Sequence, residues 1–308
     1  MACTINPDDV KRVKGLGFLN NKGTDDFNAR VLTANGNITA KQMSVVAEAA
    51  EKYGSGRVEF TTRLSIEVPG VHYDNIEAFR EYIATAGLET GGTGAKVRPV
   101  VSCKGTTCQY GLYDTFGLSE KIHERFYKGY HDYKLPHKFK IATGGCPNNC
   151  VKPTLNDLGV MGQRKPIYDA DKCKGCKKCK IEELCLMKAP KVVDGVMNID
   201  PDKCIHCGRC VGKCSFDAIT DGEFYYAVYI GGRWGRTSAI GTRLGKAFAT
   251  EEEVLNVIEK AILLFSEKGN AGERFADVID RMGFENVEKE LLSDDILARK
   301  DEILKNAK

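Results

Sequence analysis

The spacing of the cysteines constrains this chain more than any other feature of its sequence. Eight of its thirteen cysteines fall between positions 173 and 214. Seven of the eight form two runs, Cys173, Cys176 and Cys179 in the first and Cys204, Cys207, Cys210 and Cys214 in the second, and Cys185 lies between the runs. A tetrahedral zinc site usually takes two separated Cys-x2-Cys pairs, whereas three cysteines in this tight rhythm bind corners of a [4Fe-4S] cube. The pattern therefore favours iron-sulfur clusters over zinc.

The fourth ligand of each cluster follows from the same pattern. In two-cluster ferredoxins, the last cysteine of each run binds the other cluster. That exchange assigns Cys173, Cys176, Cys179 and Cys214 to one cluster, and Cys204, Cys207, Cys210 and Cys185 to the other. Cys185 follows Cys179 after five residues instead of three, and Ser215 stands where the pattern normally has proline.

A second redox candidate lies at Leu135–Cys150. In Lys138–Ala142 the two lysines alternate with apolar residues, which predicts a half-buried strand with both ammonium groups on one face. Cys146 and Cys150 follow at i and i+4, a spacing that aligns both sulfurs if the segment after Pro147 is helical. The stretch suits a redox centre beside an anion. The alternative is a solvated basic strand followed by an inert cysteine turn.

Composition limits the compartment and the partners. The 308 residues predict two or more domains. Lys+Arg 45 against Asp+Glu 42 does not suggest nucleic acid or a membrane surface as the main partner. No apolar run approaches about 18 residues and the N-terminus has no hydrophobic signal region, so we expect a cytoplasmic protein without membrane insertion. Because cytosolic thiols stay reduced, the cysteines are interpreted as metal ligands: three sets of four, with Cys3 left over.

The N-terminal part predicts a mixed α+β unit, with helices on one face of an antiparallel sheet. Ile38–Tyr53 has the periodicity of a helix that ends at Gly54. Arg57–Val68 alternates as one strand, which directs Arg63 away from the core. Near the other end of the chain, Thr250–Lys268 predicts a helix that begins with a capping box.

Four segments carry a resemblance to a known family. They are Thr61-Thr62-Arg63, the pair Cys103 and Cys108 together with Gly145-Cys146-Pro147-Asn148-Asn149-Cys150, then Asp157–Gly162, and Tyr229–Arg233. With these segments, the chain resembles the siroheme-containing sulfite and nitrite reductases, most closely the anaerobic sulfite reductase catalytic subunits with a built-in ferredoxin domain.

The resemblance implies an α+β fold: a siroheme sulfite reductase half-fold of mixed sheets and helices with an inserted two-cluster [4Fe-4S] ferredoxin-like domain. The expected domains are a ferredoxin-like α+β domain at 1–92, the first part of the siroheme and [4Fe-4S] domain at 93–165, the insert at 166–221, and the second part with C-terminal helices at 222–308.

The resemblance also implies the site. Cys103, Cys108, Cys146 and Cys150 would hold a third [4Fe-4S] cluster, and Cys150 would bridge it to the siroheme iron. Cys103 and Cys108 are separated by four residues, where the family usually has five. Arg63, Arg98, Lys138 and Lys140 would bind the anion. Further candidates for holding the siroheme carboxylates are Arg233, Arg236 and Arg243, with Thr106 and Thr107 as hydrogen-bond donors; an ordinary surface role is the alternative for each.

The implied reaction is the six-electron reduction of sulfite to sulfide, with electrons relayed through the clusters. Lys138 and Lys140 would lower each other's pKa by like-charge repulsion, which suits a proton donor. Nitrite reduction to ammonia is one alternative, and a non-catalytic polyferredoxin-like electron carrier is another. The electron-carrier alternative leaves unexplained the four predicted anion-binding cations and the cysteine pairs Cys103/Cys108 and Cys146/Cys150.

The electron source is expected to be another protein. No flavin or nicotinamide motif is evident, and the chain has one copy of a half-fold that single-chain reductases contain twice, which suggests a homo- or hetero-oligomer. Five lysines crowd the first cysteine run: Lys172, Lys174, Lys177, Lys178 and Lys180. They are either a solvated face or a docking surface for an acidic electron carrier.

Overall fold

The computed structural model describes residues 3–307. Its N-terminal unit is a four-stranded antiparallel sheet in the order β1-β2-β4-β3. The strands are β1 (Phe18–Asn20), β2 (Asp26–Val31), β3 (Glu59–Phe60) and β4 (Ile66–His72), and the helices are α1 (Pro7–Gly15), α2 (Ala40–Tyr53) and α3 (Ile76–Ala84), with a 3-10 turn, η1 (Tyr73–Asn75), before α3. Side chains from α2, α3 and one face of the sheet form a single core, which confirms the expected α+β class.

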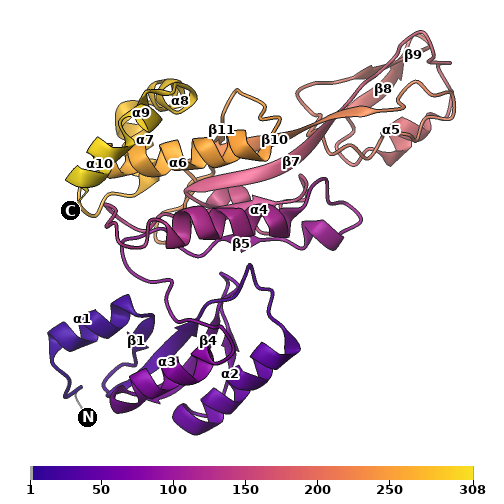
Figure 1. Ribbon diagram of the computed structural model, residues 1–308. Coiled ribbons are helices and arrows are strands. Elements are labelled where there is room, and N and C mark those ends of the chain that lie inside the picture. Colours follow the sequence, from indigo (N-terminus) through magenta and orange to yellow (C-terminus); the bar gives the residue numbers. More distant parts are fainter. Residues whose placement is uncertain (1–2, 308) are drawn as a thin grey trace.

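The other face of this sheet is polar. Along β2 the side chains alternate between buried and half-buried, as an alternating strand requires. Arg30 on this face pairs with Glu67 of β4 and also donates to the carbonyl of Gly92 at 3.4 Å. The polar face of the N-terminal unit therefore contacts the linker that leads to the central sheet (Figure 1).

The central sheet has five strands in the order β11-β10-β7-β6-β5. They are β5 (Val101–Ser102), β6 (Ile141–Gly144), β7 (Leu158–Pro166), β10 (Gly222–Ile230) and β11 (Thr242–Arg243). β6 pairs in parallel with both β5 and β7, whereas β10 is antiparallel to β7 and β11. Segments that contain Cys103, Cys146 and Asp157 therefore all lie beside the three parallel strands.

Helices cover this sheet and bury its apolar residues in the largest core of the molecule. They are α4 (Thr115–Ile122), continued by a π-helix, η3 (His123–Lys128), and α6 (Glu251–Lys268), α7 (Phe275–Met282), α8 (Phe284–Leu292), α9 (Asp295–Ala298) and α10 (Lys300–Asn306). The predicted capping box of α6 is present: the Thr250 side chain accepts from Glu253 N–H at 3.2 Å, and the Glu253 side chain accepts from Thr250 N–H. Within residues 3–307, each helix is too short or too polar to span a bilayer.

A small unit with its own core lies between β7 and β10. It contains α5 (Lys180–Leu184) and a two-stranded antiparallel sheet of β8 (Pro190–Val193) and β9 (Val196–Ile199). Ile181, Met197 and Ile219 are buried together in this unit, with several cysteines packed against them. Figure 1 shows that β7 and β10 extend out from the central sheet to this unit, at the opposite end from α10.

The predicted single strand Arg57–Val68 is wrong. A turn at Thr61–Ser65 separates β3 from β4, with Leu64 in the left-handed region at a φ of 61°. Thr61 Oγ1 accepts hydrogen bonds from the backbone of Arg63 and Ser65, both at 3.2 Å. These local hydrogen bonds compete with those of a β-ladder. The backbone therefore reverses direction at this turn, although the alternating apolar pattern of the sequence continues through it. Phe60, which a single alternating strand would place on the face opposite Arg63, is 74% exposed.

Candidate functional site

Arg63 projects from the β3–β4 turn toward the central sheet. Its guanidinium donates to Asn156 Oδ1 at 3.0 Å and to the carbonyl of Pro99 at 2.9 Å, so it connects the two units. Burial, with the nearby cation of Arg98, lowers the pKa of Arg63 to about 10. Because this pKa is well above 7, the buried Arg63 guanidinium stays positively charged at neutral pH.

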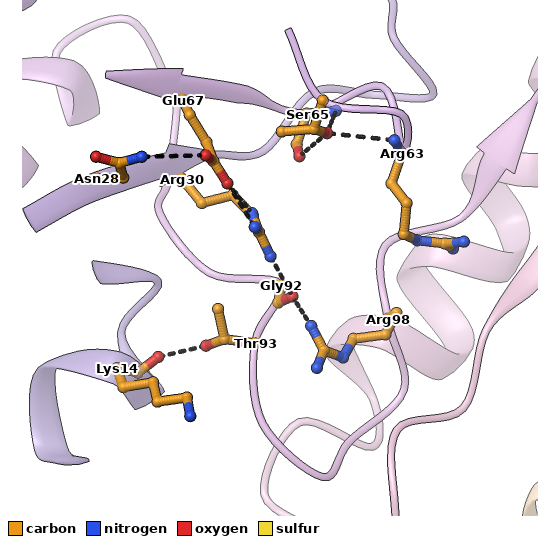
Figure 2. A network of polar contacts seen from close by, with 10 residues as sticks. Lys14, Asn28, Arg30, Arg63, Ser65, Glu67, Gly92, Thr93 and Arg98 are labelled. Atoms are coloured by element: carbon orange, nitrogen blue, oxygen red, sulfur yellow. Dashed lines mark hydrogen bonds and ion pairs between the residues drawn. The ribbon is translucent and has the colours of Figure 1, made fainter. Parts of the chain in front are cut away.

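Arg98 precedes β5 and lies close to the same place. Its guanidinium donates to the carbonyl of Gly92, which also accepts from Arg30 (Figure 2). Burial lowers the pKa of Arg98 to about 10, and the charge of Arg30 contributes. Arg30 also donates to Glu67, whereas the one hydrogen bond that the Arg98 side chain donates within residues 3–307 goes to Gly92. Most of the five N–H groups of the Arg98 guanidinium are therefore unused.

The strand side of the site carries Lys138 and Lys140. Phe139 and Ile141 are fully buried, whereas both lysines are half-buried, as the alternation predicts. The regular strand begins at Ile141, later than expected, although Phe139 already bridges to Val97. The two lysines therefore point away from the core side by side.

The pKa values of both lysines are lowered, but repulsion between them is not the main cause. Burial is the largest contribution for each. It lowers the pKa of Lys140 to about 8, with the charge of Arg63 contributing next and that of Lys138 after it. Lys140 is thus a cation that can lose its proton near physiological pH.

The four core cysteines come together at the ends of the parallel strands. The backbone of Cys103 donates to Thr143 at 3.1 Å, and Cys103 Sγ accepts from Gly145 N–H at 3.2 Å. Burial raises the pKa of the Cys146 thiol, and the charges of Cys103, Cys150 and Cys108 raise it further. The four cysteines thus lie in one region of the molecule, while no three of their side chains within residues 3–307 meet at the spacing of a single-ion site.

The segment after Pro147 is not helical, so the condition under which the i, i+4 spacing would align Cys146 and Cys150 is not met. Cys146–Cys150 forms an irregular turn in which Asn149 has a φ of 58° and its N–H donates to the Cys146 carbonyl at 3.3 Å. Asparagine tolerates this left-handed conformation better than most residues. The turn leaves Cys150 exposed, while Cys146 stays half-buried.

One cavity joins the cations to the cysteines. It has a volume of about 370 Å³, and its lining includes Arg63, Lys140, Cys150 and Trp234. An anion in this cavity would therefore meet cationic groups from two separate units, with a thiol at the wall.

The cavity's surroundings fit a polyanionic cofactor. Five arginines have a buried Nε with no hydrogen-bond partner among residues 3–307: Arg63, Arg98, Arg233, Arg243 and Arg274. Buried donors are usually paired, and an unpaired one costs about 1–3 kcal/mol. The carboxylates of siroheme are acceptors of the kind that these donors lack.

The other sequence-predicted residues are arranged differently. Arg233 forms an ion pair with Asp277, and Arg243 stacks over the ring of Tyr225 at 5.2 Å. Arg236 is exposed in the loop between β10 and β11. Thr106 donates to Asp114 at 2.7 Å and Thr107 to the Lys104 carbonyl at 3.4 Å, so both hydroxyls already have acceptors within the protein.

In the insert, one set of four cysteines surrounds a shared cavity. This cavity of about 240 Å³ is lined by Cys185, Cys204, Cys207 and Cys210, together with apolar residues. The charges of Cys207, Cys204 and Cys185 all raise the pKa of Cys210, after burial. Despite its longer spacer, Cys185 thus lies with the three cysteines to which the sequence assigned it. Among residues 3–307, no three side chains of Cys, His, Asp or Glu meet at the spacing of a single-ion site.

The other set lies farther out. Cys173, Cys179 and Cys214 pack against the small core of the insert. Cys173 Sγ accepts from Met197 N–H at 3.4 Å. The loop at Gly175 approaches the β8–β9 turn so closely that a Cβ there would lie 2.0 Å from the carbonyl oxygen of Gly195.

Sequence reasoning missed Arg274 and Trp234. Arg274 lies next to α7 and donates to both carboxylate oxygens of Asp157 at 2.9 Å. The only available signal was the Asp157–Gly162 segment, which gave no partner because 117 residues separate the two side chains. Trp234 is the single tryptophan of the chain and is 67% exposed.

Two family models match the chain. Residues 93–297 match the nitrite and sulphite reductase 4Fe-4S domain, and residues 20–86 match the nitrite/sulfite reductase ferredoxin-like half domain. An uncharacterized protein of Methanocaldococcus jannaschii is 31% identical over 85% of this chain and 90% of its own length.

Other relatives are longer or more distant. The coenzyme F420-dependent sulfite reductase of the same organism is 31% identical over 79% of this chain but only 38% of its own length. Among solved structures, dissimilatory sulfite reductase I superposes with a TM-score of 0.69 at 23% identity, covering 86% of this chain and 69% of that one. At this identity the superposition supports the fold alone.

The cysteine geometry of the insert can be tested by iron content. We expect Cys185→Ala to lower the iron bound per chain by about four atoms, because the sequence predicts Cys185 as the fourth ligand of one cube. Cys3→Ala is the matched control and should leave the iron content unchanged. Iron and acid-labile sulfide, measured on anaerobically purified protein, give the result. Equal iron in the two variants would contradict the assignment.

Proposed function

Because the chain belongs to the nitrite and sulphite reductase family, we propose that it is the catalytic subunit of a siroheme sulfite reductase that reduces sulfite to sulfide. The observation that carries the proposal is the cavity shared by Arg63, Lys140 and Cys150. It brings a thiolate that can bridge a cluster to a haem iron within reach of cations that can hold an oxyanion. Nitrite, reduced to ammonia, is the second candidate substrate, because the family includes both activities.

Siroheme, when bound, supplies an iron that can take the substrate and pass electrons to it. Cys103, Cys108, Cys146 and Cys150 would hold the adjoining [4Fe-4S] cluster, with Cys150 on the side of the cavity. The buried arginine Nε groups support a polyanionic macrocycle, with Arg233 and Arg243 as candidates for its carboxylates. Thr106, Thr107 and Arg236 have less support, since they are exposed.

The chain's own cations would handle the substrate. A sulfite dianion must lose water to enter the cavity, and Arg63, Arg98, Lys138 and Lys140 replace that solvation with fixed positive charge. Reduction also requires protons as the oxygens leave as water. Lys140, with a pKa of about 8, holds a proton at neutral pH that it can release and regain.

The arrangement of the cysteines supports an electron relay with two clusters in the insert. Pro147 and Asn148, from the core cysteine turn, also line the cavity of Cys185, Cys204, Cys207 and Cys210. A neighbouring groove of about 420 Å³ is lined by both Cys146 and Cys207. Electrons would pass from the outer set, through this inner set, to the core cluster.

The outer cysteine set is where an electron-donor protein would bind. Lys174, Lys177, Lys178 and Lys180 are exposed around it, and among residues 3–307 none of them has an ion-pair partner, whereas Lys172 pairs with Asp169 at 3.4 Å. Acidic residues are also present, at Asp171, Glu182 and Glu183. Free lysines beside the outermost cluster would attract an acidic carrier by electrostatic steering.

An absorption spectrum of anaerobically purified protein tests the proposed function. We expect Soret and red-region bands of siroheme over the broad absorption of iron-sulfur clusters, together with sulfide formation from sulfite. A spectrum of clusters alone, after expression with siroheme supplied, would support the non-catalytic electron carrier instead. Turnover with nitrite in place of sulfite would select the second substrate.

The pH dependence of turnover tests Lys140. As the pH rises through about 8, Lys140 loses its charge, so kcat/KM for sulfite should fall. Lys140→Met should lower kcat about 10²-fold, as the loss of a charge-stabilising donor does. Lys140→Arg keeps its positive charge over this pH range, so any fall in kcat/KM that remains in this variant reports the ionisation of sulfite itself. If Lys140→Met weakens binding while kcat is unchanged, the proton-donor role is wrong.

Salt dependence tests the docking surface. The rate of reduction by a reduced, acidic ferredoxin should decline as ionic strength rises, because steering is screened. Lys177→Gln/Lys178→Gln should slow this rate severalfold at low salt. Lys41→Gln/Lys289→Gln removes the same charge from distant exposed positions and should have little effect. A rate that stays flat with salt would contradict docking at these lysines.

A further inference from the structure

One buried carboxylate lies at the centre of the cation cluster. Asp157 is fully buried just before β7. Its Oδ2 accepts from the backbone N–H of Lys140 at 2.9 Å, and both of its oxygens accept from Arg274 Nη2 at 2.9 Å. Asp157 therefore connects the lysine-bearing strand to the start of α7.

Arg274 lies among the four predicted anion-binding cations. The Arg274 side chain is 14% exposed, and its Nε is buried without a partner within the described part of the chain. Its charge acts on Arg63, Arg98, Lys138 and Lys140, and for Lys138 it is the strongest electrostatic influence. Through Asp157, which also accepts from the backbone N–H of Lys140, Arg274 is held beside the strand that carries Lys138 and Lys140.

We propose that Asp157 and Arg274 form a charge-balancing pair for the anion site, in which Arg274 is a fifth cation and Asp157 is the counter-ion that keeps the five together. The proposal rests on the proposed function for the identity of the anion. The physical basis of the pair is independent of the proposed function, because five cations packed together repel one another whatever anion they bind.

The charges around Lys140 allow a specific prediction. Four charged groups act on Lys140: Arg63 of the β3–β4 turn, Lys138 of the same segment, Arg274 at the start of α7 and Asp157 at the start of β7. Cys150 and Lys152 line the same cavity as Lys140. Of these, only Asp157 is a carboxylate. Removing Asp157 makes the site more positive, and removing Arg274 makes it less positive.

These two changes should shift anion affinity in opposite directions. Asp157→Asn keeps an oxygen acceptor for the Lys140 N–H and should tighten the binding of inorganic sulfate about three- to tenfold. Arg274→Gln should weaken it by a similar factor. If the pair were merely structural, both variants would change sulfate affinity in the same direction, because each substitution would loosen the same packing.

Calorimetric titration of the holoprotein with sulfate, at a pH where Lys140 is protonated, provides the measurement. Sulfate binding requires no turnover, so this result is independent of whether the protein reduces sulfite. The double variant Asp157→Asn/Arg274→Gln restores the net charge and should bind within about twofold of the unsubstituted protein. Weaker binding in both single variants, or no change in either, would overturn the proposal.

Breaking a buried ion pair is strongly destabilising, so Asp157→Asn needs a second test in case it does not fold. Arg274→Lys keeps the charge but loses the guanidinium fork. It should lower the melting temperature as Arg274→Gln does, while its sulfate affinity stays near that of the unsubstituted protein. Equal sulfate affinity in Arg274→Lys and Arg274→Gln would overturn the proposal.

Discussion

Five cationic side chains lie near one buried carboxylate, which among residues 3–307 forms an ion pair with Arg274 only. The rest of the site depends on this excess of positive charge. Arg63, Arg98, Lys138, Lys140 and Arg274 act on one another through space, and Asp157 is the anion among them. Concentrated like charge with little water is unfavourable unless something compensates it. The surrounding fold holds these groups in place, and the remaining excess of positive charge is what an anionic substrate or cofactor would neutralise.

The parallel strands β5, β6 and β7 bring this charge next to the cysteines. Their ends carry Cys103 and the Cys146–Cys150 turn, while the segments that enter them carry Arg98, Lys140 and Asp157. Arg63 comes from the N-terminal unit, and its hydrogen bonds to Asn156 and Pro99 fix that unit against the sheet. A displacement of either unit would therefore alter the cation cluster and the cavity together.

The same strands connect the cavity to the insert. β7 and β10 continue outward, and their connection forms the unit that contains the eight clustered cysteines. The inner set lies beside Pro147 and Asn148, so the core cysteine turn has the anion cavity on one side and the insert on the other. This order is what a chain of one-electron steps toward a buried anion requires.

Local sequence determined the features that depend on spacing: the alternation that buries Phe139 and leaves Lys140 half-buried, the grouping of Cys185 with Cys204, Cys207 and Cys210, and the capping box of α6. Pattern reasoning failed at Thr61–Ser65, where the Thr61 hydroxyl accepts from nearby backbone N–H groups and ends the strand. At Cys146–Cys150 the left-handed backbone of Asn149 keeps the segment out of a helix. Only the tertiary structure decided which distant groups meet. The pairing of Asp157 with Arg274 and the convergence of Arg63 on Lys140 depend on how the two sheets and α7 pack, and residues that far apart along the chain leave no local pattern that specifies their contact.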